Sequence, residues 1–403
     1  MKIEDLKPII YIISFGILVF IIVFIIVFVP TKLKKNANDN IFKNRIQKCL
    51  AVYENYPQIN QQNIPNNGKY FNKYYNTQKY YGLRDFFYSA SYKSYLPCGF
   101  TNDVVSYNAI KNVLLAGARV INLDIFFKGP YPFADESEII VGNVIDGKLS
   151  FLQGSPENQH YLNFSNCLDI INDLAWKKTD APLFLYLKLE FSENKKLEYQ
   201  VYSQLLSKLS SRFLDKYYSF QRVNIGDIPF NMAQNKLIIL TDRKPVCGQL
   251  NEITNGLMSP MSTNLILYSI TDTDVAYGGI KTHFPKKENA QETTQFNLVA
   301  VIKEIKPNKN NRYNPKIDTI NYDTSENFDI GISITFMNWQ NYPGNDKHME
   351  NYLERFKEGG MILKPQNLIY QTRPKPTVYK RDNTFDYNNN NVSGLNGFYN
   401  FNT

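Results

Sequence analysis

Histidine and cysteine, which often carry acid–base, nucleophilic or metal chemistry, are few in this chain of 403 residues. Imidazole titrates near neutrality and can both accept and donate a proton, so the first candidates are the three histidines, His160, His283 and His348. The cysteines are too far apart for a Cys-x-x-Cys motif and too few for a disulfide scaffold: Cys49, Cys98, Cys167 and Cys247. The sequence therefore predicts neither a cysteine-ligated metal nor a cysteine-stapled secreted domain.

The composition is that of a chain that buries a large core. Hydrophobic residues make up 43% of it and charged residues 20%, which excludes general disorder. Lys and Arg outnumber Asp and Glu by 45 to 37, giving a formal charge of +8 that favours anionic partners. No nucleic-acid-binding motif accompanies this charge, so nucleic acid is not an expected partner.

An apolar run near the amino terminus predicts a membrane span. Ile9 to Val29 reads IIYIISFGILVFIIVFIIVFV, without a charged side chain. About 20 helical residues cover a hydrocarbon core of about 30 Å, so we expect a transmembrane helix over residues 9–30 after a short flank, 1–8. More lysines and arginines follow the run than precede it. The positive-inside rule then predicts a single-pass membrane protein with its large carboxyl-terminal part on the cytoplasmic or an equivalent face.

The remaining chain divides into a linker, an α/β region and a tail. Residues 31–80 are rich in Asn, Gln, Tyr and Lys without a helical or strand period, which indicates a linker or collar. Beyond them, segments with helical spacing (107–117, 164–176, 199–218) alternate with short apolar strands (119–127, 182–191, 236–242). Strict alternation predicts parallel strands with helical crossovers, an α/β sheet or barrel. Residues 373–403 are of low complexity and form a predicted tail.

Several segments in order resemble the phosphoinositide-specific phospholipase C family, whose catalytic barrel has halves called X and Y. Residues 117–124 (GARVINLD), 175–191 (AWKKTDAPLFLYLKLEF) and 228–240 (IPFNMAQNKLIIL) are similar to X-half motifs. Residues 331–340 (GISITFMNWQ), Phe356 and 360–365 (GMILKP) are similar to Y-half motifs. The resemblance implies a distorted (β/α)8 TIM-type barrel over residues 81–372, with the X half at about 85–246 and the Y half at about 263–370.

The family's proton carriers are absent from the positions that the resemblance assigns to them. Its two catalytic histidines correspond to Tyr92, in the segment SYKSY, and to Gly142, in the segment EIIVGN. A phenol with a pKa of about 10 is a poor general base near neutrality, and glycine has no side chain. None of the three histidines lies at a position matched to catalysis, so the expectation is that the chain has no catalytic residues of the family type.

The family's calcium ligands are also replaced. The matching positions carry Lys93, Asn122, Asp124 and Lys188, and a shift of two residues would put Glu190 in the last of them. Calcium requires oxygen ligands, and ammonium groups repel it. We therefore expect no metal and no other cofactor.

The resemblance leads to a leading hypothesis and two alternatives. The leading one is a membrane-anchored, phospholipase C-like pseudoenzyme that acts as a binding or structural module. Residues that could hold a phosphate or inositol headgroup at the barrel mouth without cleaving it are Lys93, Arg119, Asp124, Lys188, Arg243 and Lys244. These lysines could equally be solvated, or could pair internally with Asp124. The alternatives are an active phosphoric diester hydrolase with rearranged, metal-independent catalysis, and an interaction protein that binds partners through the barrel surface.

Overall fold

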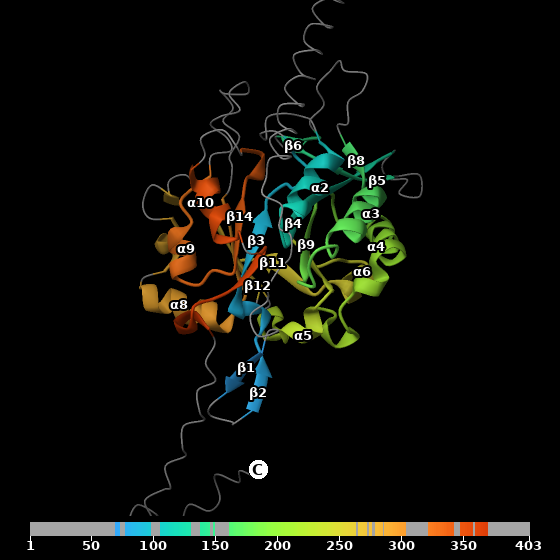
Figure 1. Cartoon of the computed structure of the whole chain (residues 1–403). Coiled ribbons are helices and arrows are strands. Elements are labelled where there is room, and N and C mark those ends of the chain that lie inside the picture. The colour runs from blue at the N-terminus through green and yellow to red at the C-terminus, as the bar shows by residue number, and fades with distance from the viewer. Residues whose placement is uncertain are drawn as a thin grey trace, which may run out of the picture.

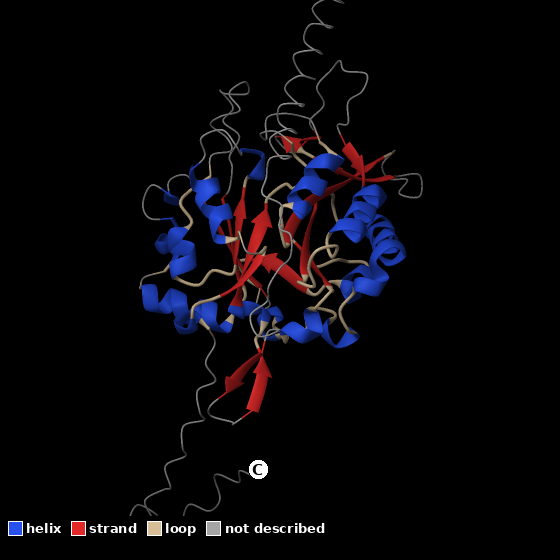
Figure 2. Ribbon diagram, viewed as in Figure 1, coloured by secondary structure: helices blue, strands red, loops and turns tan. Residues whose placement is uncertain are grey.

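The computed structural model describes residues 69–72, 77–97, 105–129, 138–145, 148–149, 161–262, 265–271, 274–275, 279–284, 286–303, 321–341, 347–357 and 359–369. Within them, parallel strands lie in the middle of the molecule (Figures 1 and 2), and their pairing forms a closed ring. In order around the ring these are β3 (Phe86–Ser91), β4 (Val120–Lys128), β9 (Leu183–Leu189), β10 (Leu237–Thr241), β11 (Gly256–Ser259), β12 (Leu265–Ile270), β13 (Val299–Lys303) and β14 (Ile334–Met337), which pairs again with β3. The predicted eight-stranded α/β barrel is confirmed.

The strand register has the stagger of a TIM barrel. Pairing followed once around the ring returns to its starting residue only after steps along the strands that total eight residues. Its successive points are Phe184, Ile238 to Leu240, Gly256 to Met258, Leu265 to Ile266, Val299 to Ala300, Ile334, Tyr88 to Ala90, Val120 and Phe184 again. Eight strands with a shear of eight define the TIM geometry, so the strands themselves identify the fold.

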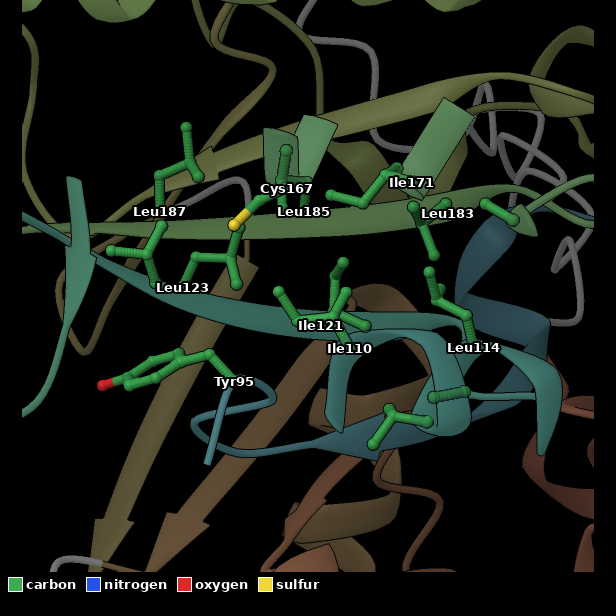
Figure 3. Packing of buried hydrophobic residues seen from close by; sticks show 14 of the residues in the cluster. Tyr95, Ile110, Leu114, Ile121, Leu123, Cys167, Ile171, Leu183, Leu185 and Leu187 are labelled. Carbon is green, nitrogen blue, oxygen red and sulfur yellow. The ribbon is translucent and has the colours of Figure 1, made fainter. Parts of the chain in front are cut away.

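Side chains alternate between the inside of the barrel and its helical layer. Inside, Tyr88, Phe184, Ile238 and Leu240 belong to one buried cluster with Phe336. Outside, the intervening residues of β4 and β9, such as Ile121, Leu123 and Leu185, pack against α2 and α3 (Figure 3). A strand buried on both faces reads as a continuous apolar run, which is the pattern of these segments.

Helices surround the barrel (Figure 2). They are α2 (Tyr107–Leu115), α3 (Phe164–Leu174), α4 (Lys195–Leu209), α5 (Phe230–Ala233), α6 (Gly248–Ile253), α8 (Lys287–Phe296), α9 (Ser325–Asp329) and α10 (Lys347–Arg355). The side chains of Ser106, Asn163 and Asn194 accept backbone N–H bonds and so cap α2, α3 and α4. The helix predicted over 199–218 is α4, which begins earlier and ends at Leu209, followed by 3-10 turns.

Other strands depart from strict alternation. β5 (Glu138–Gly142) pairs antiparallel with β4, and β8 (Tyr161–Asn163) pairs antiparallel with β5. β15 (Met361–Leu363) runs antiparallel to β3, and β6 (Val144–Ile145) forms a hairpin with β7 (Lys148–Leu149). β11 and β12 are parallel neighbours joined by residues 260–264 alone. Strict alternation was therefore wrong at these places. β6, β7, β8 and β15 have only two or three residues each and show no period of their own, and the five residues between β11 and β12 are too few for a helical crossover.

The predicted linker and membrane span have different outcomes. The end of the predicted linker, 31–80, contains the hairpin β1 (Lys69–Asn72) and β2 (Thr77–Tyr80), which projects from the amino-terminal end of the barrel (Figure 1). The predicted span, Ile9 to Val29, and the tail, 373–403, lie outside the described residues and stay predictions. Among the residues that the structure describes, no helix is long and apolar enough to cross a bilayer.

Lys364, which follows β15, is a buried cation whose titration should affect folding. Its Nζ lies 3.5 Å from the Thr294 carbonyl oxygen and 5.5 Å from the centre of the Phe87 ring. Burial lowers the pKa of Lys364 from 10.5 to about 7, although the neighbouring Asp85 carboxylate opposes this shift. Between these two values the unfolded chain binds more protons than the folded chain, so stability rises with pH.

We therefore expect the free energy of unfolding to increase between about pH 7 and pH 9, by at most about 1.4 kcal/mol per pH unit. Lys364→Met should be more stable at neutral pH and should show a flatter profile over the same interval. Urea unfolding of both proteins at several pH values measures this. Identical slopes for the two proteins would contradict the assignment.

Candidate functional site

The carboxyl-terminal ends of β3, β4 and β9 bring predicted site residues together. Lys93 lies in the turn after β3, and Asp124 lies on β4 directly beside Lys188 of β9 in the strand register. Asn122 and Asp124 are two residues apart on β4 and therefore share the inner face of the barrel. In TIM barrels this end is where active sites form. We call Lys93, Tyr95, Asn122, Asp124 and Asn143 the mouth cluster.

Lys93 is held in place by both its backbone and its side chain. Its φ of 45° is in the left-handed region, and its backbone N–H donates to Asn122 Oδ1 at 3.0 Å. Its ammonium donates to Asn143 Oδ1 at 2.8 Å and lies 3.2 Å from Asp124 Oδ2, with only 11% of the side chain exposed. The Lys93 side chain is therefore directed at Asp124 and Asn143, as the internal-pair alternative predicted.

The Asp124 carboxylate is completely buried and its oxygens are already bonded. Oδ2 accepts from the Tyr95 hydroxyl at 3.0 Å and pairs with the Lys93 ammonium, and Oδ1 accepts from Asn122 Nδ2 at 3.2 Å. Burial, reinforced by the Asp124 charge, raises the pKa of Tyr95 well above its usual value, so the phenol stays a donor. The Lys93 ammonium lies against Asp124, the residue at a calcium-ligand position of the family. A divalent cation needs oxygen ligands and is repelled by an ammonium group, so this arrangement does not fit one.

Lys188 forms a second ion pair with an acidic residue at the barrel mouth. It is 38% exposed and pairs with Glu190, and Asp242 lies within electrostatic reach. Desolvation lowers the pKa of Lys188, but the Asp124, Glu190 and Asp242 charges together outweigh it and raise the pKa above the usual value. Burial raises the pKa of Asp242, whose Oδ1 accepts from the Leu189 N–H at 2.9 Å. Three carboxylates therefore surround two ammonium groups here, which is unfavourable for a phosphate.

Arg243 and Lys244 follow β10, and the hydrogen bonds of Arg243 lead away from the mouth cluster. Arg243 NH1 donates to Glu198 Oε1 at 2.6 Å, and NH2 donates to the Phe191 carbonyl at 3.2 Å. Glu198 lies on α4 and is fully buried, and its Oε2 accepts from the Cys247 N–H at 2.7 Å. Lys244 is exposed. Arg243 thus links α4 to the loop before α6.

Arg119 lies at the opposite end of the barrel. It precedes β4, is 1% exposed, and donates to the carbonyls of Ala118, Ala175 and Ala181 at 3.0, 2.7 and 3.4 Å. Burial lowers the pKa of Arg119 to about 10. The expectation that Arg119 joins Lys93 in one site was wrong, because five residues of an extended strand separate its Cα from Asp124 by about 16 Å.

The positions matched to catalysis carry packing roles. Tyr92 donates its backbone N–H to the Met337 carbonyl at 3.0 Å, and its ring lies 6.3 Å from that of Phe336. Gly142 is buried in β5 opposite Tyr161. Of the histidines, His283 packs on Tyr268 with ring centres 5.4 Å apart and His348 lies on α10, whereas His160 is outside the described residues. The Asp124 carboxylate bonds to neither His283 nor His348.

Sequence reasoning did not identify three residues of this region. Tyr95 and Asn143 complete the mouth cluster, and Glu198 binds Arg243. Glu198 had a usable signal, because it interrupts the apolar face of α4 formed by Leu197, Val201 and Leu205. Asn143 had none, since its contact depends on the antiparallel return of β5 along β4.

Comparison with known proteins supports the fold. No protein-family model matches the chain, and no curated protein sequence does. The crystal structure of L. pealei PLC21 matches with a TM-score of 0.53 at 15% identity, covering 71% of this chain and 38% of that one. The crystal structure of S. officinalis PLC21 matches with a TM-score of 0.55 at 16% identity, covering 73% and 38%. The chain therefore has a phospholipase C-like TIM-barrel fold and spans about two fifths of the length of these proteins.

Proposed function

We propose that this chain is a membrane-anchored, phospholipase C-like barrel that acts as a binding or structural module and does not hydrolyse phosphodiesters. The single observation that carries the proposal is the bonded state of Asp124. Both of its oxygens are already engaged: Oδ2 with the Lys93 ammonium and the Tyr95 hydroxyl, and Oδ1 with the Asn122 amide, so a cation or a substrate hydroxyl would have to compete with these bonds. A fold alone does not supply catalysis, which depends on the groups at the site.

The neighbouring groups support the same conclusion. General acid–base catalysis requires a group that exchanges protons near the working pH. At the mouth, the pKa of Tyr95 is raised by burial and that of Lys188 by its carboxylate neighbours, so both groups keep their protons at neutral pH. Among the described groups at the mouth, the Asp242 and Glu190 carboxyls are the remaining candidate bases. One Asp242 oxygen is occupied by the Leu189 N–H, and Glu190 is paired with Lys188.

The hydrolysis test uses the full chain reconstituted with phosphatidylinositol vesicles. We expect no release of water-soluble inositol phosphate above the buffer rate, with or without calcium, while an active phospholipase C releases it in a parallel assay. Release that depends on the chain and is lost in Asp242→Asn would establish the alternative, an active hydrolase with rearranged catalysis, and would remove the pseudoenzyme proposal.

The membrane anchor rests on the apolar run from Ile9 to Val29, and it is tested separately. The full chain should remain in the membrane pellet after alkaline carbonate extraction, and a chain lacking residues 1–30 should move to the supernatant. Extraction of the full chain by carbonate would contradict the anchor without affecting the conclusion about catalysis.

A further inference from the structure

A hollow of about 430 Å³ lies between the first turns of α4 and α6, outside the barrel. The two helices are packed together, and each follows the carboxyl-terminal end of a barrel strand (Figure 1). The hollow is lined by Lys195, Lys196, Tyr199, Gln200, Val246, Cys247, Gly248 and Gln249. Its volume is within the range of small-molecule sites. None of these residues belongs to the mouth cluster, so the hollow is independent of the proposed function.

The positive charge beside the hollow lies at a helix terminus that disfavours it. Lys195 and Lys196 are the first residues of α4, and both are exposed. The partial positive charge of a helix amino terminus disfavours cations there. Glu198, the acidic residue of the same turn, is turned inward and bonded to Arg243 and to the Cys247 N–H. A local rule broken at a surface hollow is typical of a functional site.

The opposite wall of the hollow is open at Gly248. A Cβ added there would have no neighbouring atom within 4 Å, and Gly248 does not have the positive φ that favours glycine. Neither packing nor backbone conformation therefore requires glycine at this position, whereas its small size leaves room for a ligand. Gln200 and Gln249 add amide donors, and the half-exposed Tyr199 adds a phenol.

We propose that this hollow binds a phosphate monoester. A monoester carries about −1.5 to −2 charge at neutral pH and several acceptor oxygens, which matches two adjacent ammonium groups and two amides. A soluble phosphorylated metabolite and a phosphomonoester lipid headgroup share this chemistry. An acidic peptide is the competing occupant, but it needs an extended groove, and the lining of the hollow comes only from the short segments 195–200 and 246–249.

The open space at Gly248 allows a test that spares the fold. Gly248→Glu places a carboxylate in the hollow, and Gly248→Gln is the neutral control of the same size. Both proteins, as full chains, are titrated with glycerol 3-phosphate by calorimetry, and with phosphatidylcholine vesicles that contain or lack phosphatidic acid. A poly-glutamate peptide is the third probe. Lys195→Ala/Lys196→Ala removes the cations, and Lys177→Ala/Lys216→Ala removes two exposed lysines elsewhere.

We expect the unaltered chain to bind a monoester, and both Gly248→Glu and the Lys195/Lys196 pair to weaken binding by about tenfold or more. Gly248→Gln and the Lys177/Lys216 pair should change it less than about twofold. Preference for phosphatidic acid vesicles over glycerol 3-phosphate identifies a lipid headgroup, and the reverse identifies a soluble ligand. Absence of monoester binding, indifference to Gly248→Glu, or tighter binding of poly-glutamate would overturn the proposal.

Discussion

Lys93→Met is expected to lower the free energy of unfolding by about 3 to 5 kcal/mol, because it leaves a buried carboxylate without its cation. Asp124 has no exposed surface, and Lys93 Nζ is the only positive charge bonded to it among the described residues. Methionine keeps much of the length of the lysine stem, so the loss measures charge and hydrogen bonding more than packing. Urea unfolding monitored by circular dichroism gives the difference directly.

The double variant Lys93→Met/Asp124→Asn separates the ion pair from general disruption. With the charge removed from both partners, the asparagine can still accept the Tyr95 hydroxyl, and most of the lost stability should return. Asp124→Asn alone should cost less than Lys93→Met, since Lys93 keeps the Asn143 oxygen and some access to water. A Lys93→Met protein within about 1 kcal/mol of the unaltered chain would show that the pair does not hold the mouth together.

The barrel could be predicted because its strands are coded locally. Runs such as 183–189 are apolar on both faces and are separated by amphipathic helices, and this pattern is enough to indicate parallel strands with crossovers. The added strands could not be predicted in this way. β8 and β15 have three residues each, and they pair with strands distant in sequence, so neither length nor period marks them.

The site was predicted in part for the same reason. The two-residue spacing of Asn122 and Asp124 places both inside the barrel, and the resemblance placed Lys93 near them. Whether Lys93 faces a ligand or Asp124 depends on a left-handed turn and on Asn143, which are tertiary features. Arg119 and Asp124 belong to the same motif, but β4 places them at opposite ends of the barrel. Residues of one motif therefore need not share one site.

Gly360→Ala should destabilise the barrel more than any other single methyl addition among the glycines whose surroundings the structure describes. Gly360 precedes β15, and its carbonyl accepts the Ser89 N–H of β3 at 2.8 Å. A Cβ built on Gly360 would lie 1.6 Å from the Gly117 carbonyl oxygen and 3.1 Å from Arg119 Cγ. The obstacle is backbone that precedes β4, so relief requires β15 to separate from the barrel.

Gly360→Ala should lower the free energy of unfolding by about 3 kcal/mol or more, which is at the upper end of overpacking effects. Soluble expression should fall as well. Gly248→Ala is the matched control, since no atom lies within 4 Å of its added methyl group and alanine is favoured over glycine in a helix. That variant should be as stable as the unaltered chain or slightly more stable.

Because Gly360, Gly117 and Arg119 meet at the amino-terminal end of the barrel, Gly360→Ala should leave phosphate binding between α4 and α6 unchanged in whatever fraction folds. Equal stability of Gly360→Ala and Gly248→Ala would mean that the close approach of Gly360 to Gly117 is not needed to hold β15 against β3.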